Sequence, residues 1–492
     1  MQCPHCSKEI DINREFCPGC GKRVNVAFSE IAASVQDDAA MRRRRLIEES
    51  LRWGTLVLVI AVTVIWALND HLNRPLTFDG ADIPALDVPP PKPGKAELLL
   101  KPEVGQVEFQ APAPGLPRVF AYRLPPVRDS VRDANGFPKE CVDAVRKGLA
   151  YLSKNQLQDG SWSSEGRKEQ PAANQDEWKW GKYRLGPTGM TALVVLAFLG
   201  EGETWLPNDA GKVSDNGKKI QKAVEFLIKS QDETNGRFGP LQGQFIYNHC
   251  MATLAVVEAA GMTGDPFLRE SAQKGLDLIQ RLMQAGPNGA LGVEDKVNEP
   301  EDIMPMGWAV QALAAGQEAN FSVKPEVLEK ALGFFQKITD KTKGEVAFNT
   351  VDTTHFGSQS PTALLCRIRL GESAQSPDLK IVTKNTMQNQ YQPKVDPQGK
   401  WGNGWREGQV GADDKGRAQA FQPYRLYYAS SALFMVGGDD WKAFSGALFA
   451  AYPKLQNNDG GWYGNDTRSL QSGPIFSTAL SILALQSCYR QQ

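Results

Sequence analysis

The sequence predicts an all-α protein whose main domain is an α6/α6 toroid of six helical hairpins, preceded by a small zinc ribbon, one transmembrane helix and a proline-rich linker. Three observations lead to this prediction: four cysteines within the first 20 residues, one long apolar run, and a helical phrase that recurs through the C-terminal part. The expected segments are a zinc ribbon at 1–25, a basic juxtamembrane segment at 26–50, a transmembrane helix at 51–69, a linker at 70–135 and the toroid at 136–492.

The zinc ribbon is predicted from cysteine spacing. The pattern C-x2-C-x10-C-x2-C is formed by Cys3, Cys6, Cys17 and Cys20. Each C-x2-C pair presents two thiolates from one tight turn, and four thiolates complete a tetrahedral, structural zinc site. A segment of about 25 residues has too small a core to fold without such a cross-link. We therefore expect zinc as a structural cofactor, with a redox or disulfide pair as the alternative.

The apolar run WGTLVLVIAVTVIWALN, from Trp53 to Asn69, is just long enough to span a bilayer. Trp53 and Trp66 fit interfacial anchors at its two ends, and the basic run 42–45 precedes it. By the positive-inside rule, the N-terminus is expected in the cytoplasm and the toroid outside it. The sequence thus predicts a single-pass protein of the cell membrane; a signal peptide and a buried core helix are the alternatives.

The net charge and the proline-rich segment bear on partners and on domain spacing. The net charge of −1 gives no basic excess, so no nucleic-acid partner is expected. The segment 70–135 contains PPPKPG and QAPAPGLP. Such proline-dense stretches favour extended polyproline II structure and resist packing, so this segment is expected to act as a spacer.

From about residue 136, two kinds of helical segment alternate. The first is amphipathic and ends in a glycine–aromatic turn, as in YLSKNQLQDGSW, which is typical of an outer helix. The second is apolar nearly all round, as in GMTALVVLAFLG, which indicates a buried inner helix. The six expected turns are at Trp162, Phe238, Leu291, Phe348, Trp401 and Trp462. The chain ends lack the polar caps of an open solenoid, so six hairpins are expected to close into a ring.

The phrases NQLQDGSW and LQNNDGGW resemble the Gln-Trp motifs of the squalene–hopene cyclase and prenyltransferase repeat superfamily. The resemblance covers about residue 138 to the end and implies an α/α toroid. That superfamily contains cyclases, zinc-dependent prenyltransferases and proteins that are not enzymes. The Asp-x-Asp-Asp acid motif of the cyclases is absent from this sequence, and no segment matches the prenyltransferase zinc ligands. The resemblance therefore assigns no catalytic residue.

Candidate site residues follow from the predicted geometry. The parallel inner helices of a toroid gather their N-termini at one mouth, where the positive dipole ends favour an anion. The candidates for ligand binding there are Tyr247, Asn248, His249, Trp308, Arg425, Tyr427 and Tyr428. His249 is expected to face the ring's interior, where a histidine could serve as the base of a lyase. A capped histidine and core packing of the aromatics are the structural alternatives.

The predicted function is that of a membrane-anchored toroid with a binding or assembly role, holding an unknown protein or a lipid-like ligand. The alternative is a terpenoid cyclase- or prenyltransferase-like enzyme, or a lyase that uses the cavity, so the sequence leaves open whether the protein is an enzyme. At the ring seam, Cys141 and Cys488 are expected on the same face. They form either a disulfide or two separate buried thiols.

Overall fold

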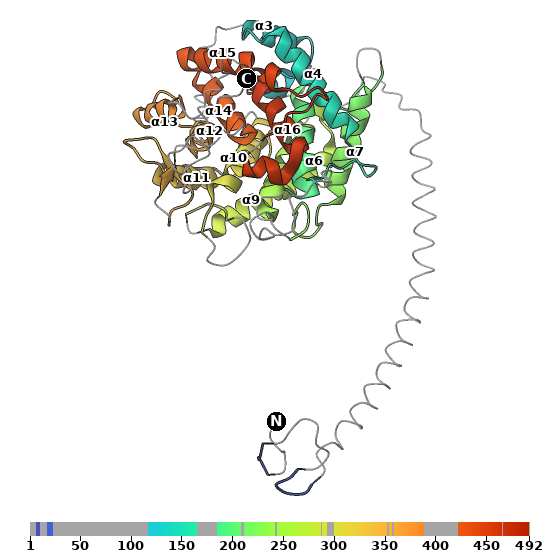
Figure 1. The fold of residues 1–492 in the computed structure, drawn as a ribbon, viewed down its shortest axis with the longest axis vertical. Coiled ribbons are helices and arrows are strands. Elements are labelled where there is room, and N and C mark those ends of the chain that lie inside the picture. The colour runs from blue at the N-terminus through green and yellow to red at the C-terminus, as the bar shows by residue number, and fades with distance from the viewer. Residues whose placement is uncertain are drawn as a thin grey trace, which may run out of the picture. The chain divides into compact units, whose positions relative to one another are not determined.

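A computed structural model of the chain divides into two compact units, Met1–Pro91 and Lys92–Gln492 (Figure 1). The residues that it describes are 6–9, 17–22, 117–164, 185–207, 211–241, 244–286, 288–292, 300–351, 354–356, 359–387, 422–464 and 466–491. The predicted transmembrane helix at 51–69, Cys3 and the expected turn at Trp401 lie outside these residues. Among the helices within them, none has both the length and the hydropathy that a membrane span requires.

Within the described part of residues 139–490, twelve helices alternate between two layers. The outer helices are α4 (Lys139–Lys154), α7 (Asp215–Lys229), α9 (Pro266–Ala285), α11 (Pro325–Lys337), α13 (Pro377–Met387) and α15 (Gly438–Leu455). The inner helices are α6 (Pro187–Gly200), α8 (Phe245–Thr263), α10 (Ile303–Glu318), α12 (Ser360–Arg369), α14 (Pro423–Val436) and α16 (Thr467–Arg490). This is the alternation that the sequence predicted.

The inner helices form a closed ring. Each packs against the next along the chain, and α16 packs against α6. Outside them, α15 contacts α4, so the last and first hairpins are neighbours in both layers (Figure 1). The predicted α/α toroid is therefore confirmed.

The two layers follow from two residue patterns. Every residue of α6 after Pro187 is buried, as its uniformly apolar sequence requires. The outer helix α7 buries only one face, formed by Ile220, Ala223, Val224 and Leu227. That spacing of three and four residues is the apolar stripe of an amphipathic helix.

In three of the described hairpins, the recurring turn contacts the next outer helix through a glutamine, at Gln156, Gln231 and Gln456. The Nε2 amide of Gln156 donates to Gly160 O at 2.9 Å and to Lys219 O of α7 at 2.8 Å. Gln456 repeats the arrangement at the seam, donating to Gly460 O at 2.8 Å and to Ala144 O of α4 at 2.7 Å. The repeated phrase is thus the joint between neighbouring outer helices.

Glycine and tryptophan complete this joint. Gly160 has φ +89°, and a Cβ there would lie 2.6 Å from Lys222 O of the next outer helix. Only glycine tolerates both the positive φ and this close approach. The indole Nε1 of Trp162 donates to Leu152 O at 2.8 Å, which fixes the buried ring against the end of its own outer helix.

The inner helices share one direction, which gives the ring two different mouths. Asn248 at the start of α8 contacts Gly186 at the start of α6, and Gln486 near the end of α16 contacts Ala197 near the end of α6. We call the two faces the N-terminal mouth and the C-terminal mouth, after the ends of the inner helices that lie there.

Two features differ from the sequence-based prediction. Residues 117–134, which were expected to belong to the linker, form α2 (Arg118–Ala121) and α3 (Val127–Ala134) and bury Phe120 and Val131 completely. This stretch carries apolar side chains as well as prolines, and the ring offers them a surface. The second difference is a minimal antiparallel pair, β1 (Val346–Ala347) with β2 (His355–Phe356), so the domain is not strictly all-α.

Candidate functional site

His249 lies in a hairpin interface and does not face the ring's interior. Its buried Nδ1 accepts a hydrogen bond from the Phe238 N–H at 3.1 Å, and its Nε2 lies 3.2 Å from Gly275 O of the outer helix α9. These contacts define a neutral imidazole with its proton on Nε2. Burial is the main cause that lowers the pKa of His249, to about 4. The expectation of an interior-facing base is therefore wrong.

His249 occupies a position whose contact recurs in other hairpins. In the first hairpin, Thr191 Oγ1 accepts a hydrogen bond from the Trp162 N–H at 3.0 Å. In the last hairpin, Thr478 Oγ1 accepts from the Trp462 N–H at 2.9 Å. His249 accepts from the N–H of the equivalent turn residue, so it fastens a turn to an inner helix as the two threonines do.

Asn248 also has a structural role. Its Oδ1 accepts from the Gly186 N–H at 3.2 Å, and its Nδ2 donates to Gln244 O at 2.9 Å. The side chain therefore joins the starts of α6 and α8. The sequence left open a helix-capping role for His249, and the structure shows this role for the neighbouring Asn248.

The remaining predicted aromatics meet among the inner helices. Trp308 of α10 stacks on Tyr427 of α14, with ring centroids 5.5 Å apart, and meets Tyr428 edge-on at 5.9 Å. Tyr424, also of α14, lies 4.9 Å from Tyr428 and 6.5 Å from Tyr247 of α8. All five rings are buried. We call these five residues the aromatic cluster.

The polar atoms of the aromatic cluster fall into two groups. Tyr427 Oη donates to Gln311 Oε1, and Gln311 Nε2 donates to Tyr428 Oη at 3.3 Å. By contrast, Tyr247 Oη, Tyr424 Oη and Trp308 Nε1 are buried without a hydrogen-bond partner among the described residues. Burial is the main cause that raises the pKa of Tyr247 and Tyr424, so both hydroxyls keep their protons.

Tyr247 lies close enough to Tyr424 and Trp308, and Tyr424 close enough to Tyr428, for these polar groups to influence the tyrosine pKa values, yet Tyr247 Oη, Tyr424 Oη and Trp308 Nε1 make no hydrogen bond of acceptable geometry. A buried donor without an acceptor costs about 1–3 kcal/mol, and native proteins contain few such groups. Three of them in one cluster therefore need a specific explanation.

Charged groups flank the aromatic cluster. The Arg468 guanidinium lies over the rings of Tyr424 and Tyr247, with Cζ 5.2 and 5.9 Å from their centroids. Asp466 caps α16 by accepting from the N–H groups of Arg468 and Ser469 at 3.1 and 3.3 Å. Burial raises the pKa of Asp466, although Ser469 and the two arginines Arg425 and Arg468 oppose this. The predicted candidate Arg425 is half-buried and belongs to this charged group.

The C-terminal mouth is covered by the segment that contains α2 and α3. Glu258 of α8 forms ion pairs with Arg123 and with Arg490, both at 2.7 Å, and all three side chains are buried. Arg490 Nη1 also donates to Leu196 O, near the end of α6, at 3.0 Å. The negative ends of the inner helices converge here, so buried arginines have a clear electrostatic role. This mouth is a structural closure.

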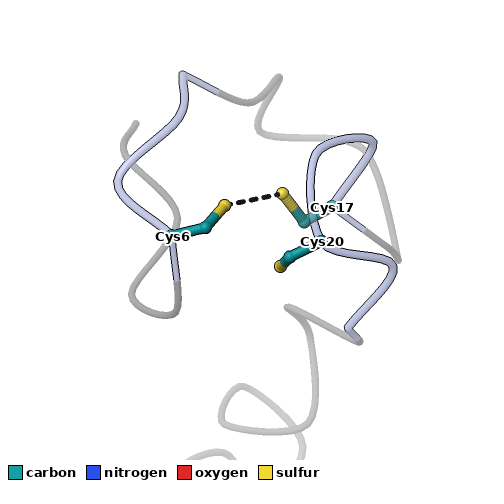
Figure 2. Close-up of side chains that lie close together, drawn as sticks. All are labelled: Cys6, Cys17 and Cys20. Carbon is teal, nitrogen blue, oxygen red and sulfur yellow. Dashed lines mark hydrogen bonds between the residues drawn. The ribbon is translucent and has the colours of Figure 1, made fainter.

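The N-terminal module brings three of its four predicted ligands together (Figure 2). The Sγ atoms of Cys6, Cys17 and Cys20 lie within 4.8 Å of one another, and those of Cys6 and Cys17 are 3.6 Å apart. Sulfurs on a tetrahedral zinc with bonds of about 2.3 Å are about 3.8 Å apart, so the three thiols fit that ion. The Gly19 N–H donates to Cys17 Sγ at 3.4 Å, which favours a thiolate. Cys3 lies outside the described residues.

The seam cysteines are two separate buried thiols. Cys141 Sγ donates to Phe449 O at 3.4 Å, and burial raises the pKa of Cys141 to about 12. Cys488 is likewise a buried thiol, and its Sγ donates to Leu485 O at 3.9 Å. Asn135, just before α4, donates to Cys488 O at 3.2 Å, so the start of the first outer helix does lie beside the end of the last inner helix, as predicted.

Comparisons with known proteins identify no activity. No family model and no curated protein matches the sequence. A mannosidase of glycoside hydrolase family 76 from Bacteroides thetaiotaomicron is 12% identical, with a TM-score of 0.48 over 71% of this chain and 98% of its own. A cellobiose 2-epimerase from Spirochaeta thermophila is 12% identical, with a TM-score of 0.48 over 74% and 99%. A type II terpene cyclase from Scytonema is 14% identical, with a TM-score of 0.44 over 72% and 98%. We transfer no function from these similarities.

Proposed function

We propose that the toroid is a ligand-binding domain and that its binding site is the N-terminal mouth, above the aromatic cluster. The observation that carries this proposal is the set of three buried polar atoms without partners, on Tyr247, Tyr424 and Trp308. They come from three different inner helices, α8, α14 and α10, and their rings pack against one another. A bound ligand would supply the missing hydrogen-bond partners.

The arrangement favours binding over alkene protonation. A protonating cyclase needs a carboxylic acid that faces the substrate. The rings packed against Trp308 are tyrosines, and the buried carboxylate Glu258 is held by two arginines at the opposite mouth. The buried Asp466 lies at the N-terminal mouth but accepts hydrogen bonds from the first N–H groups of its own helix. The lyase alternative, an elimination with His249 as the base, has no support because both imidazole nitrogens of His249 form contacts in a hairpin interface.

The test is native mass spectrometry of the full chain incubated with the small-molecule fraction of a cell extract. We expect a retained adduct with the wild-type protein and a weaker one with Trp308→Phe or Tyr424→Phe, since each variant removes one unpaired polar atom and keeps an aromatic ring. Tyr463→Phe is the matched control, because the Tyr463 hydroxyl is exposed and donates to Asp459. An adduct that survives all these substitutions unchanged, or no adduct at all, would refute the proposal.

Catalysis at the same mouth is the second candidate, and one observation favours it. Asp466 is buried with a raised pKa and shares Arg468 with the aromatic cluster, which are the properties of a general acid. Asp466→Asn keeps the ability to cap α16. If the mouth is catalytic, this variant should bind the captured small molecule but no longer convert it; unchanged conversion would exclude Asp466 as the acid.

For the N-terminal module we propose a structural zinc held by Cys3, Cys6, Cys17 and Cys20. The support is the thiol geometry of three of these residues and the sequence position of the fourth. Elemental analysis should find one zinc per chain in the wild type and none in Cys17→Ser, whereas Cys250→Ala, which removes a buried toroid thiol, should keep the metal. Full zinc content in Cys17→Ser would contradict the proposal.

We also propose that residues 51–69 anchor the chain in the cell membrane, with the zinc module in the cytoplasm and the toroid outside. Its support is the apolar run and the basic residues that precede it. Deletion of residues 51–69 should move the protein from an alkali-washed membrane fraction to the supernatant. Recovery of the undeleted chain in the supernatant would refute the anchor.

A further inference from the structure

The inner helix α16 is broken near its start. Gly473 has φ +81° and ψ −177°, which lie outside the helical region, and the next residue, Pro474, has no N–H to donate. Residues 467–472 therefore form a separate short helix ahead of the rest of α16, and we call them the arm. Asp466 caps the arm by accepting from the Arg468 N–H at 3.1 Å, so the arm is a local unit with its own start.

The arm crosses the N-terminal mouth. In the ring, α16 packs against α14 and α6. The Arg468 guanidinium lies over the ring of Tyr424 on α14, but it also lies over the ring of Tyr247, which belongs to α8. At the other end of the arm, Ser472 Oγ accepts from the Leu185 N–H, just before α6, at 3.4 Å. The arm therefore contacts residues at the starts of three inner helices.

The arm covers the outermost rings of the aromatic cluster. Tyr247 and Tyr424 lie in the first turns of α8 and α14, whereas Trp308 and Tyr428 lie further along their helices. Arg468 lies over the outer pair, and these two rings are only 3% and 4% exposed. A ligand can therefore reach the aromatic cluster only if a group that covers it moves.

The conformation and the surroundings of Gly473 suit a hinge. A positive φ combined with a ψ near 180° is a region that only glycine adopts readily. Among the described residues, a Cβ at Gly473 would meet only Ser164 O, at 3.9 Å. By contrast, a Cβ at Gly160 would lie 2.6 Å from Lys222 O in the joint between two outer helices. Rotation at Gly473 therefore meets little steric resistance, whereas rotation at a joint glycine does not.

We propose that the arm is a lid on the aromatic cluster and that it opens by rotation at Gly473 to admit the ligand. In the closed state, Arg468 lies on the rings of Tyr247 and Tyr424, and Ser472 is bonded to the backbone before α6. Opening releases these contacts and exposes the two outer rings. This inference rests on the proposed ligand-binding function and adds the way in which access to the site is controlled.

Hydrogen exchange of the ligand-free full chain, read by mass spectrometry, measures the opening. Peptides from the arm should exchange at least about tenfold faster than peptides from residues 477–487, because the arm opens without global unfolding. Gly473→Ala strains the closed hinge and should speed exchange in the arm at least about fivefold further, with no change at 477–487. The matched control is Gly264→Ala. Gly264 also has a positive φ, +69°, with no described atom within 4 Å of its Cβ, but it ends α8 at the opposite mouth.

Arg468→Ala tests the lid through a contact instead of the hinge. The variant removes the group that lies over the two outer rings, so it should speed exchange in the arm at least about threefold. The matched control is Arg269→Ala, because Arg269 lies over the ring of Phe321 on the outer helix α9 and should leave the arm unchanged. Exchange in the arm as slow as at 477–487, in the wild type and in both variants, would overturn the lid.

Release of the captured small molecule separates the lid from the proposed function. If the lid retains the ligand, the adduct from the cell-extract fraction should dissociate at least about threefold faster from Gly473→Ala than from the wild type or Gly264→Ala, as measured by native mass spectrometry after dilution. Equal release rates would overturn the lid's control of access, while the proposed function survives if the adduct still depends on Trp308 and Tyr424. Loss of that dependence, or no adduct at all, would overturn the proposed function itself, whatever the exchange rate of the arm.

Discussion

Gln456→Ala tests whether the ring is closed. The Gln456 amide donates to Gly460 O within its own turn and to Ala144 O of α4, across the seam between the last and first hairpins. The substitution removes both hydrogen bonds. At about 1 kcal/mol for each bond, we expect a loss of about 2 kcal/mol in the free energy of unfolding. This is a large effect for a half-buried side chain.

The matched variant is Gln156→Ala, which breaks the same two bonds at the junction between the first and second hairpins. In a closed ring the seam is equivalent to any other junction, so both variants should lose similar amounts. Urea unfolding of the full chain measures this as a lower midpoint with an unchanged slope. The exposed Gln317→Ala should stay within about 0.5 kcal/mol of the wild type.

The comparison has two informative failures. If Gln456→Ala behaves like the exposed control while Gln156→Ala costs about 2 kcal/mol, the seam is open in solution and the ring argument is wrong. If both variants behave like the control, the glutamine is not the joint between hairpins, and the explanation of the repeated phrase fails.

Three further predictions concern the toroid's interior. The pKa of His249 is about 4 in the folded protein and about 6.5 in the unfolded chain. The contribution of His249 to the free energy of unfolding is therefore complete above pH 6.5 and falls by up to about 3 kcal/mol toward pH 4, because only the unfolded chain takes up the proton in this range. His249→Thr should flatten this part of a stability–pH curve, and an unchanged curve would show that another group causes the loss. Gly160→Ala, at φ +89° and 2.6 Å from Lys222 O, should cost at least about 2 kcal/mol in thermal melting; a neutral result would mean that the turn relaxes freely. Glu258→Gln leaves two arginines buried without their carboxylate and should cost about 3–5 kcal/mol. The control Glu270→Gln changes an exposed ion pair and should leave the stability nearly unchanged; equal losses in the two variants would contradict a buried ion pair.

Local sequence determined the toroid's architecture because its repeating unit is held by short-range contacts. Glycine at a positive φ, tryptophan bonded to its own outer helix and glutamine bonded to its own turn all act within a few residues, as at Trp162 and Gln156. Such contacts leave a glycine at positive φ in the turn of each described hairpin, at Gly160, Gly236, Gly289, Gly344 and Gly460. The uniformly apolar inner segments then required burial, and that requirement placed them inside the ring.

The direction in which a side chain points was decided only by tertiary structure. Tyr247 and His249 are close neighbours on α8, and 3.6 residues per turn send them to different sides of the helix: Tyr247 joins the aromatic cluster and His249 enters a hairpin interface. From the sequence alone, Tyr247 and His249 were expected to form one polar cluster, because both lie at the same end of the helix. The phase of each inner helix depends on packing against two inner neighbours and an outer layer, which no local pattern encodes.

The sequence by itself determined the alternation of outer and inner helices, the turns that join them and the cysteine spacing of the N-terminal module. Tertiary structure alone decided that residues 117–134 close one mouth, that Arg123, Glu258 and Arg490 meet there, and that Tyr424 completes the aromatic cluster. The physical reason is distance along the chain. Helix pattern and turn chemistry act over a few residues, whereas Arg123 and Arg490 are brought together only when the ring closes.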